Sequence, residues 1–281
     1  IKDAETDTGH VQKLPGSYTL SGTENGVGLF DLSQIVGKEH IGSITEVKGA
    51  AYDKETGIAR YSAAVETPSY TYSTGSSAVS LTVEFALDLS KLPKTPFEDV
   101  KAGAWYFDAV LEAFRDELMV GMSETEFSPG APMTRAMLVS VLWRLAGEPA
   151  PKAPNTFVDV PDGAWYTDAV TWAAENGVVS GIGGSRFDPS GFVTREQTAE
   201  ILYNYAHSKG YDVSARADLT AFPDAASVSG WAEEALSWAN AAGLINGTVR
   251  DGQTILDPQG SASRAQVAMI LMNYVEHVVN A

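Results

Sequence analysis

Residues 157–196 read Phe157-Val158-Asp159-Val160, then Trp165, then Phe187-Asp188-Pro189, then Val193-Thr194-Arg195-Glu196, and this order occurs three times in the chain. The preceding copy reads Phe97-Glu98-Asp99-Val100, Trp105, Phe127-Ser128-Pro129 and Met133-Thr134-Arg135-Ala136. The following copy, the most divergent, reads Phe222-Pro223-Asp224, Trp231, Ile255-Leu256-Asp257-Pro258 and Ala262-Ser263-Arg264-Ala265. A repeat of this length indicates one supersecondary unit that buries its apolar face by stacking on its copies.

The composition is that of an acidic globular protein. The 281 residues are 44% hydrophobic, which argues against a disordered chain, and the formal net charge is −17. This charge excludes nonspecific binding to nucleic acid or to anionic membranes, so an acidic partner would need a local basic pocket. There is no cysteine, which excludes disulfides, thiolate metal sites and thiol nucleophiles. No apolar run reaches transmembrane length.

Residues 1–95 have the pattern of a separate β-rich domain. Asn25-Gly26 and the loop 53–57 have the composition of hairpin turns. Runs of strand-like composition or apolar alternation span residues 44–52, 58–65, 69–72 and 80–89. We predict a small antiparallel, sandwich-like domain, with an immunoglobulin-like spacer as one candidate. Because the chain begins at Ile1 without a signal peptide, we interpret it as a processed form or a fragment of a longer protein.

Each copy predicts two helices joined by a loop. We assign the repeats to residues 96–149, 156–209 and 219–281. In the first helix an apolar face recurs at i, i+4, i+5 and i+8: Trp105, Ala109, Val110 and Ala113; Trp165, Ala169, Val170 and Ala173; Trp231, Ala235, Leu236 and Ala239. In the second it recurs at i, i+3, i+4 and i+7: Leu138, Val141, Leu142 and Leu145; Thr198, Ile201, Leu202 and Tyr205; Val267, Ile270, Leu271 and Tyr274. The sequence therefore predicts a mainly α chain in which six helices share one core.

The ends of these helices carry recognisable signals. Gly177 and Gly243 are typical of a left-handed residue that stops the first helix, whereas the first copy has Glu117, which either ends the helix differently or is strained. The start of the second helix is marked by N-cap residues in all three copies: Thr134, Thr194 and Ser263. Glutamine three residues later predicts a capping box in the second and third copies.

These motifs resemble the S-layer homology repeat. The resemblance covers residues 97 to about 279, and the second copy is the fullest. It implies a compact fold of three lobes with pseudo-threefold symmetry and grooves between the lobes. It also implies noncovalent attachment to a secondary polysaccharide linked to peptidoglycan, often ending in a pyruvylated, anionic sugar. It says nothing about residues 1–95.

The arginine at the first helical position also predicts anion binding independently of the resemblance. A cation at the positive end of a helix dipole is mildly unfavourable, yet all three copies keep it. Free N–H groups of the first turn together with a guanidinium would suit a carboxylate such as that of a pyruvate ketal. The alternative is an internal ion pair, with Arg195 held by Asp159 or Asp188. The candidate ligand-binding residues are Arg135, Arg195, Arg264, Thr134, Thr194 and Ser263.

Two further repeated positions are candidates for lining a groove. The tryptophans could stack on sugar rings, although their helical spacing favours burial in the core: Trp105, Trp165 and Trp231. The aspartates favour tying down a loop or cap: Asp99, Asp159 and Asp224. Histidines occur at no repeated position, and no nucleotide-binding or nucleophile motif is present, so we predict no enzyme, no cofactor and no metal site.

We expect a non-catalytic anchor at the bacterial cell surface, whose partner is a wall polysaccharide and whose further partners are other surface proteins. We expect no nucleic acid partner and no membrane insertion. The alternatives are a self-assembly module of a surface lattice and an accessory part of an enzyme that acts on wall glycans. On this reading Arg195→Ala would weaken wall binding with little change in stability, and the second copy would be the strongest site.

Overall fold

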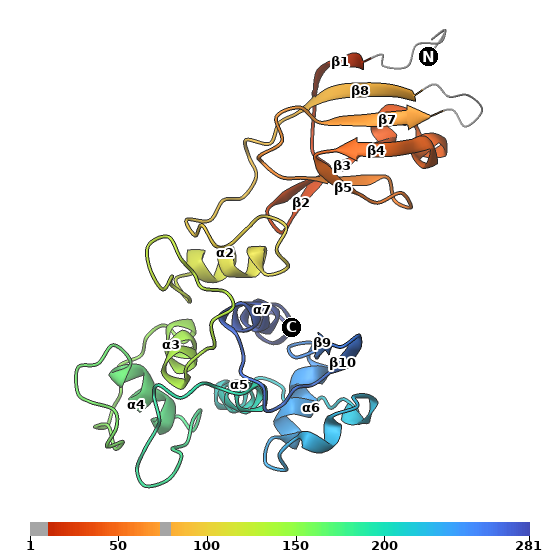
Figure 1. The fold of residues 1–281 in the computed structure, drawn as a ribbon. Helices are drawn as coiled ribbons and strands as arrows, with labels where there is room; N and C mark the ends of the chain where they lie inside the picture. Colours follow the sequence, from red (N-terminus) through yellow and green to blue (C-terminus); the bar gives the residue numbers. More distant parts are fainter. Residues whose placement is uncertain (1–10, 74–79) are drawn as a thin grey trace. The chain divides into compact units, whose positions relative to one another are not determined.

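The computed structural model describes residues 11–73 and 80–281, and the chain divides into two units (Figure 1). The first unit comprises residues 1–96 with 100–108, and the second comprises 97–99 with 109–281. Helices make up 32% of the chain and strands 21%. The prediction of a mainly α chain is therefore wrong. The β domain occupies about a third of the sequence, and the repeat helices are short, with long loops between them.

The first unit contains two four-stranded sheets. One sheet has the order β1-β8-β7-β4 and the other β2-β3-β6-β5. The strands are β1 (Val11–Tyr18), β2 (Gly22–Glu24), β3 (Val27–Asp31), β4 (Ile44–Lys48), β5 (Ala50–Tyr52), β6 (Ile58–Tyr61), β7 (Ser69–Ser73) and β8 (Ser80–Leu87). Between β3 and β4 lie helix α1 (Ser33–Val36) and a 3₁₀ segment (Lys38–Ser43). Both sheets contribute to one apolar core, as the sandwich prediction requires.

Turn chemistry explains the pairing in this unit. Asn25 and Gly26 both have positive φ, which suits the tight turn of the β2–β3 hairpin. Gly49, at φ 79°, interrupts the apolar run 44–52, so β4 and β5 enter different sheets. The prediction of a purely antiparallel domain is wrong in one place, because β1 pairs with β8 in parallel. The sequence pattern of each strand and its adjoining turns does not indicate which distant strand it pairs with.

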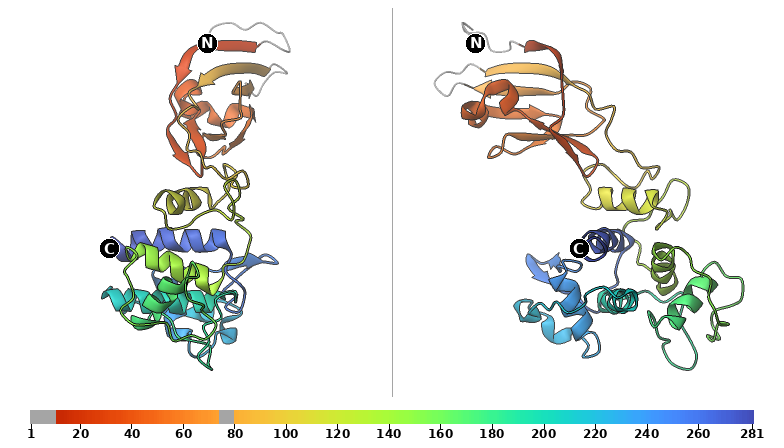
Figure 2. Two further views of the ribbon diagram at one scale, coloured as in Figure 1. Left: turned by 90° about the vertical axis from the view of Figure 1, so that its left-hand side faces the viewer. Right: turned by 180° about the vertical axis from the view of Figure 1, so that it is seen from behind.

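The second unit is built from the repeats, each contributing two helices joined by a loop (Figure 2). The first helices are α2 (Phe107–Arg115), α4 (Thr167–Glu175) and α6 (Glu233–Ala241). The second helices are α3 (Arg135–Leu145), α5 (Arg195–Lys209) and α7 (Arg264–Tyr274), the last followed by a π-helical turn (Val275–Val279). The third repeat adds two 3₁₀ turns (Leu219–Ala221 and Ala225–Ser227) and the hairpin β9 (Thr248–Arg250) and β10 (Gln253–Ile255).

A closed cycle of backbone hydrogen bonds joins the three repeats. The N–H of Met133 donates to the carbonyl of Ala262 at 2.8 Å. The N–H of Ala262 donates to the carbonyl of Val193 at 3.0 Å, and the N–H of Val193 donates to the carbonyl of Met133 at 2.9 Å. The three residues occupy the same position in the three copies. The sequence repeat is therefore matched by a cyclic arrangement, in which each repeat contacts both others. Because these residues are buried, the cycle lies in the apolar interior of the unit.

The predicted helix caps are confirmed. Thr134, Thr194 and Ser263 each accept a hydrogen bond from the N–H three residues on. In the second and third repeats the N-cap N–H also donates to the side chain of the glutamine three residues on, which completes the capping box that the sequence predicts. Glu117 lies at φ 57°, so the first repeat uses the left-handed conformation without glycine. Such a residue is disfavoured there, which leaves this helix end strained.

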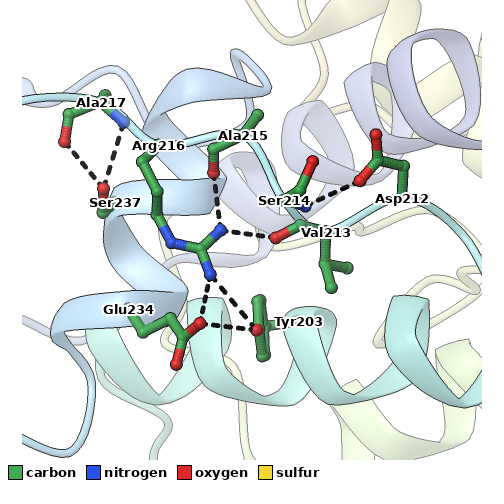
Figure 3. Close-up of polar contacts among 9 residues, drawn as sticks. All are labelled: Tyr203, Asp212, Val213, Ser214, Ala215, Arg216, Ala217, Glu234 and Ser237. Atoms are coloured by element: carbon green, nitrogen blue, oxygen red, sulfur yellow. Dashed lines mark hydrogen bonds and ion pairs between the residues drawn. The ribbon is translucent and has the colours of Figure 1, made fainter.

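Polar contacts fix the segment between the second and third repeats (Figure 3). The guanidinium of Arg216 donates to the carbonyls of Val213 and Ala215 and contacts the carboxylate of Glu234. The hydroxyl of Tyr203 donates to the same carboxylate over 3.0 Å. These contacts join α5, α6 and the segment that links them, so this segment is an ordered connection.

Candidate functional site: a groove between repeats

The three repeated arginines are buried and bind backbone carbonyls of the next repeat. Arg135 is 8% exposed, and its Nε and Nη2 donate to the carbonyls of Phe187 and Ser180 at 2.8 and 3.1 Å. Arg195 is 4% exposed, and its Nε donates to the carbonyl of Leu256 at 2.7 Å. The internal ion-pair alternative proposed that Asp159 or Asp188 holds Arg195. The structure instead shows a hydrogen bond to the backbone carbonyl of Leu256.

Arg264 closes the cycle from the third repeat to the first. Its Nε donates to the carbonyl of Phe127 at 2.8 Å and its Nη2 to that of Val120 at 2.6 Å. The guanidinium also stacks on the ring of Phe127, with its central carbon 4.4 Å from the ring centroid. Burial lowers the pKa of this arginine, and Asp99 acts in the opposite direction. The charge is thus retained inside the protein by carbonyl dipoles and an aromatic face.

The repeated aspartates hold the loops that receive the arginines. Asp159 accepts hydrogen bonds from the N–H groups of Phe187 and Asp188 at 2.8 and 2.9 Å, and Asp188 lies at φ 59°. Asp99 and Asp224 hold the equivalent loops of the other two repeats in the same way. The interpretation of these residues as loop ties is therefore confirmed by their hydrogen bonds. Each aspartate fixes a strained turn whose carbonyl then binds an arginine of another repeat.

We predict that Asp159→Ala lowers the free energy of unfolding by about 2–3 kcal/mol, because two hydrogen bonds to a charged group are lost. Burial acts to raise the pKa of Asp159, but the N–H groups and Arg186 outweigh it and hold this pKa below its usual value. Its stabilisation is therefore present above the unfolded-state pKa near 4 and is lost as the pH falls through the lower folded-state value. Urea unfolding at pH 7 and pH 3 measures both effects. A mutant deficit that does not shrink at pH 3 would contradict the assignment.

The helix N-termini are already occupied by protein atoms. The N–H of Arg195 donates to Gly260 and that of Glu196 to Pro258, and the other two repeats show the same pair of bonds. The next N–H donates to the capping hydroxyl. The expectation of free first-turn N–H groups for an anion is therefore wrong. The neighbouring repeat contributes carbonyls there, and a single helix start cannot reveal this contribution.

A groove of about 380 Å³ lies among the repeats. Its walls come from the loop at 119–122, from α3, from Trp165 of the second repeat and from Arg264 of the third. We call it the repeat-1 groove, and its residues are Met119, Val120, Gly121, Met122, Met133, Met137, Ser140, Val141, Arg144, Trp165 and Arg264. Of the predicted binding residues, it brings together Trp165 and Arg264.

The repeated tryptophans lie at the surface. Trp105, Trp165 and Trp231 are 52, 60 and 55% exposed. The expectation that helical spacing buries them in the core is wrong, because each lies two positions before the first residue of its helix, in the turn that precedes it. The true inward face begins two residues later in the first repeat, at Phe107. All three copies therefore leave a large aromatic ring accessible to solvent at the same position.

Two groove residues, Ser140 and Arg144, are not among the binding residues predicted from the sequence. Ser140 is 2% exposed, and its hydroxyl has no hydrogen-bond partner within the described part of the chain. Arg144 is 26% exposed at its side chain and donates from Nη1 to the carbonyl of Leu118. Both positions vary among the copies, so the comparison of repeats that exposed the other candidates passed over them. A polar residue on the buried side of α3 was the available signal.

Residues 11–73 and 80–281 contain neither a cluster of metal-ligating side chains nor a membrane-spanning helix. No group of three or more histidine, aspartate or glutamate side chains there is placed to hold a metal ion. Among the helices described, none combines the length and apolar character needed to cross a membrane.

Comparison with known proteins identifies the repeats. The S-layer homology domain model matches residues 96–136, 156–199 and 221–268. The surface-layer 125 kDa protein of Lysinibacillus sphaericus is 29% identical over 178 residues, which are 63% of this chain and 15% of that protein. The amylopullulanase of Thermoanaerobacterium thermosulfurigenes is 27% identical over 64% of this chain and 9% of its own length. The chain thus spans less than a fifth of these relatives.

A further S-layer protein and one solved structure are also similar to part of this chain. The S-layer protein of Bacillus thuringiensis subsp. finitimus is 25% identical over 62% of this chain and 21% of its own length. An undecaheme cytochrome from the S-layer of Carboxydothermus ferrireducens covers 52% of this chain and 18% of its own, at 21% identity and a TM-score of 0.31. The matched segments of the family model coincide with the three repeats that form the closed cycle. Residues 96–136, 156–199 and 221–268 thus belong to the S-layer homology domain family.

Proposed function

We propose that this module holds a surface protein to the bacterial cell wall by binding an anionic, pyruvylated secondary wall polysaccharide in a groove between repeats. Cell-surface location and an anchoring role follow from the family. The observation that carries the finer proposal is the repeat-1 groove, in which the exposed ring of Trp165 lies with Arg264 and Arg144. The anchor itself is non-catalytic, and the enzymes among the relatives match it over a small part of their length.

The groove suits a sugar with a negative charge. Its volume is within the range of small-molecule sites, and it combines an aromatic face with a few polar groups. Two arginines give it local positive charge in a chain of net charge −17. A carboxylate is the natural partner of a guanidinium, and the apolar methionine side chains would contact the methyl group of a ketal.

The remaining predicted binding residues support the groove indirectly. Arg135 and Arg195 tie loops of the second and third repeats, and the three capping hydroxyls fix the starts of the second helices. We therefore assign direct contact to Arg264 and Trp165, and support of the binding surface to the others. A site held by packed elements keeps its geometry, which lowers the cost of binding.

Sedimentation with purified wall sacculi tests the proposal. We expect the protein to sediment with intact sacculi and to stay in solution after hydrofluoric acid has removed the secondary polymer. Analytical ultracentrifugation without sacculi is the control for self-assembly. Sedimentation that persists on stripped sacculi would contradict the proposal, and concentration-dependent association without any wall would favour the lattice alternative.

A further inference from the structure

The positions of α3 that line the repeat-1 groove have equivalents in the second repeat, and the two sets differ in chemistry. Counting from the first helical arginine, Ser140 of α3 corresponds to Glu200 of α5, and Arg144 corresponds to Asn204. The first repeat thus presents a hydroxyl and a cation where the second presents a carboxylate and a neutral amide. Both pairs lie one turn apart on the second helix of their repeat.

The hydroxyl of Ser140 requires a partner that the described protein does not supply. Ser140 is one of the residues that line the groove, and its Oγ is buried and makes no hydrogen bond within the described part of the chain. Buried polar atoms are almost always paired in native proteins. A ligand oxygen in the groove would provide that partner. This observation is independent of the charge in the groove, and it points to the same place.

The charge of the groove favours an anion. The described residues that line it include two arginines and no aspartate or glutamate. Arg264 is fixed by the carbonyls of Phe127 and Val120, so its position is set before a ligand arrives. Arg144 lies with its Nε 4.0 Å from Glu148, an exposed carboxylate with which it forms a weak pair. A ligand carboxylate that binds Arg144 would therefore displace only this weak pair with Glu148.

The corresponding position of the second repeat opposes an anion. Glu200 accepts a hydrogen bond from Asn204, which neutralises none of its charge. Burial raises the pKa of Glu200, and the neighbouring carboxylate of Glu234 raises it further. The surroundings of this side chain therefore already disfavour negative charge. Arg216, whose contacts are drawn in Figure 3, is engaged by Glu234 and by backbone carbonyls.

We propose that the repeat-1 groove takes the carboxylate-bearing sugar, that the equivalent positions of the second repeat exclude it, and that Ser140 and Arg144 determine this choice. The inference rests on the proposed function and deepens it. It replaces the expectation that the second copy, with the most complete motif, is the strongest site. The motif specifies the folding contacts of each repeat, whereas the selectivity resides at positions where the copies differ.

Exchange of these positions tests the inference. The probe is a methyl hexopyranoside that carries a pyruvate ketal, and its methyl ester is the uncharged control. Calorimetry gives the stoichiometry, and the indole N–H resonances of Trp165 and Trp231, assigned with Trp→Phe variants, report the location. For the native chain we expect a shift at Trp165, no shift at Trp231, and at least tenfold weaker binding of the ester.

Two exchanged variants follow. In Ser140→Glu with Arg144→Asn we expect the Trp165 shift to disappear. In Glu200→Ser with Asn204→Arg we expect one additional bound probe and a new shift at Trp231. A Trp231 shift in the native chain, an unchanged Trp165 response in the first variant, or no probe binding at all would overturn the inference. Sacculi sedimentation is scored separately, so that wall binding with any of these outcomes leaves the anchoring function intact.

The single substitution Ser140→Ala is a smaller change, and it tests the inference even if the double variants do not fold. We expect its melting temperature to be equal to or above that of the native chain, because an unpaired buried hydroxyl is removed. Its affinity for the probe is expected to fall about three- to tenfold. A purely structural serine would lower stability or leave the affinity unchanged, and either result would overturn the role assigned to it.

Discussion

Replacement of Arg195 by alanine is expected to lower the free energy of unfolding by about 2–4 kcal/mol. The guanidinium is 4% exposed, and its Nε donates to the carbonyl of Leu256 in the third repeat. Removal leaves that carbonyl buried without its partner and opens a space between two repeats. The sequence alone suggested that this change would spare stability and reduce binding. The structure reverses the first half of that expectation.

Urea unfolding followed by circular dichroism measures the loss. Arg186→Ala is the matched control, because the Arg186 side chain is 61% exposed. Its Nε lies 3.5 Å from Oδ2 of Asp159, so it forms a surface ion pair. We expect the control to change the free energy of unfolding by less than about 1 kcal/mol, as for other surface pairs. Arg195→Lys should lower the free energy of unfolding nearly as much as Arg195→Ala, because an ammonium lacks the planar fork of donors. Equal effects of Arg195→Ala and Arg186→Ala would refute the structural role.

The parts of the fold that depend on neighbours in sequence were predictable. Caps at Thr194 and Ser263, their glutamine partners and the turn at Asn25-Gly26 all use side chains or backbone conformations within four residues of each other. These features can be predicted from one sequence because the interacting residues are close together in the chain. The aspartate loop ties were also predicted as a role, since a repeated aspartate beside a loop has few other uses.

The parts that depend on distant backbone were not predictable. The acceptors of the three arginines are carbonyls, and every residue has a carbonyl, so no side-chain pattern announces them. The tryptophans fitted a helical period by coincidence, although the helices begin after them. Ser140 and Arg144 vary among the copies, so the repeat pattern carries no signal at these two positions. The parallel pairing of β1 with β8 joins segments some seventy residues apart.

Trp165→Ala is expected to weaken binding to intact sacculi by at least about tenfold, while the stability of the fold changes little. Buried tryptophan anchors of interfaces commonly contribute 2 kcal/mol or more, and 1.4 kcal/mol corresponds to a factor of ten. Trp165 forms a wall of the repeat-1 groove and is 60% exposed in the free protein. Its ring is therefore available to a ligand and contributes little apolar burial to folding.

Val158→Ala is the matched control, because Val158 is another exposed apolar residue of the same repeat, at 77% exposure, and it does not line the groove. Quantitative sedimentation over a range of sacculi concentrations gives the apparent affinities, and thermal melting shows that both variants are folded. We expect Val158→Ala to bind like the native chain. If Trp165→Ala also binds like the native chain while remaining folded, the polysaccharide contacts another surface, and the groove assignment is wrong whatever the variants of Arg195 show.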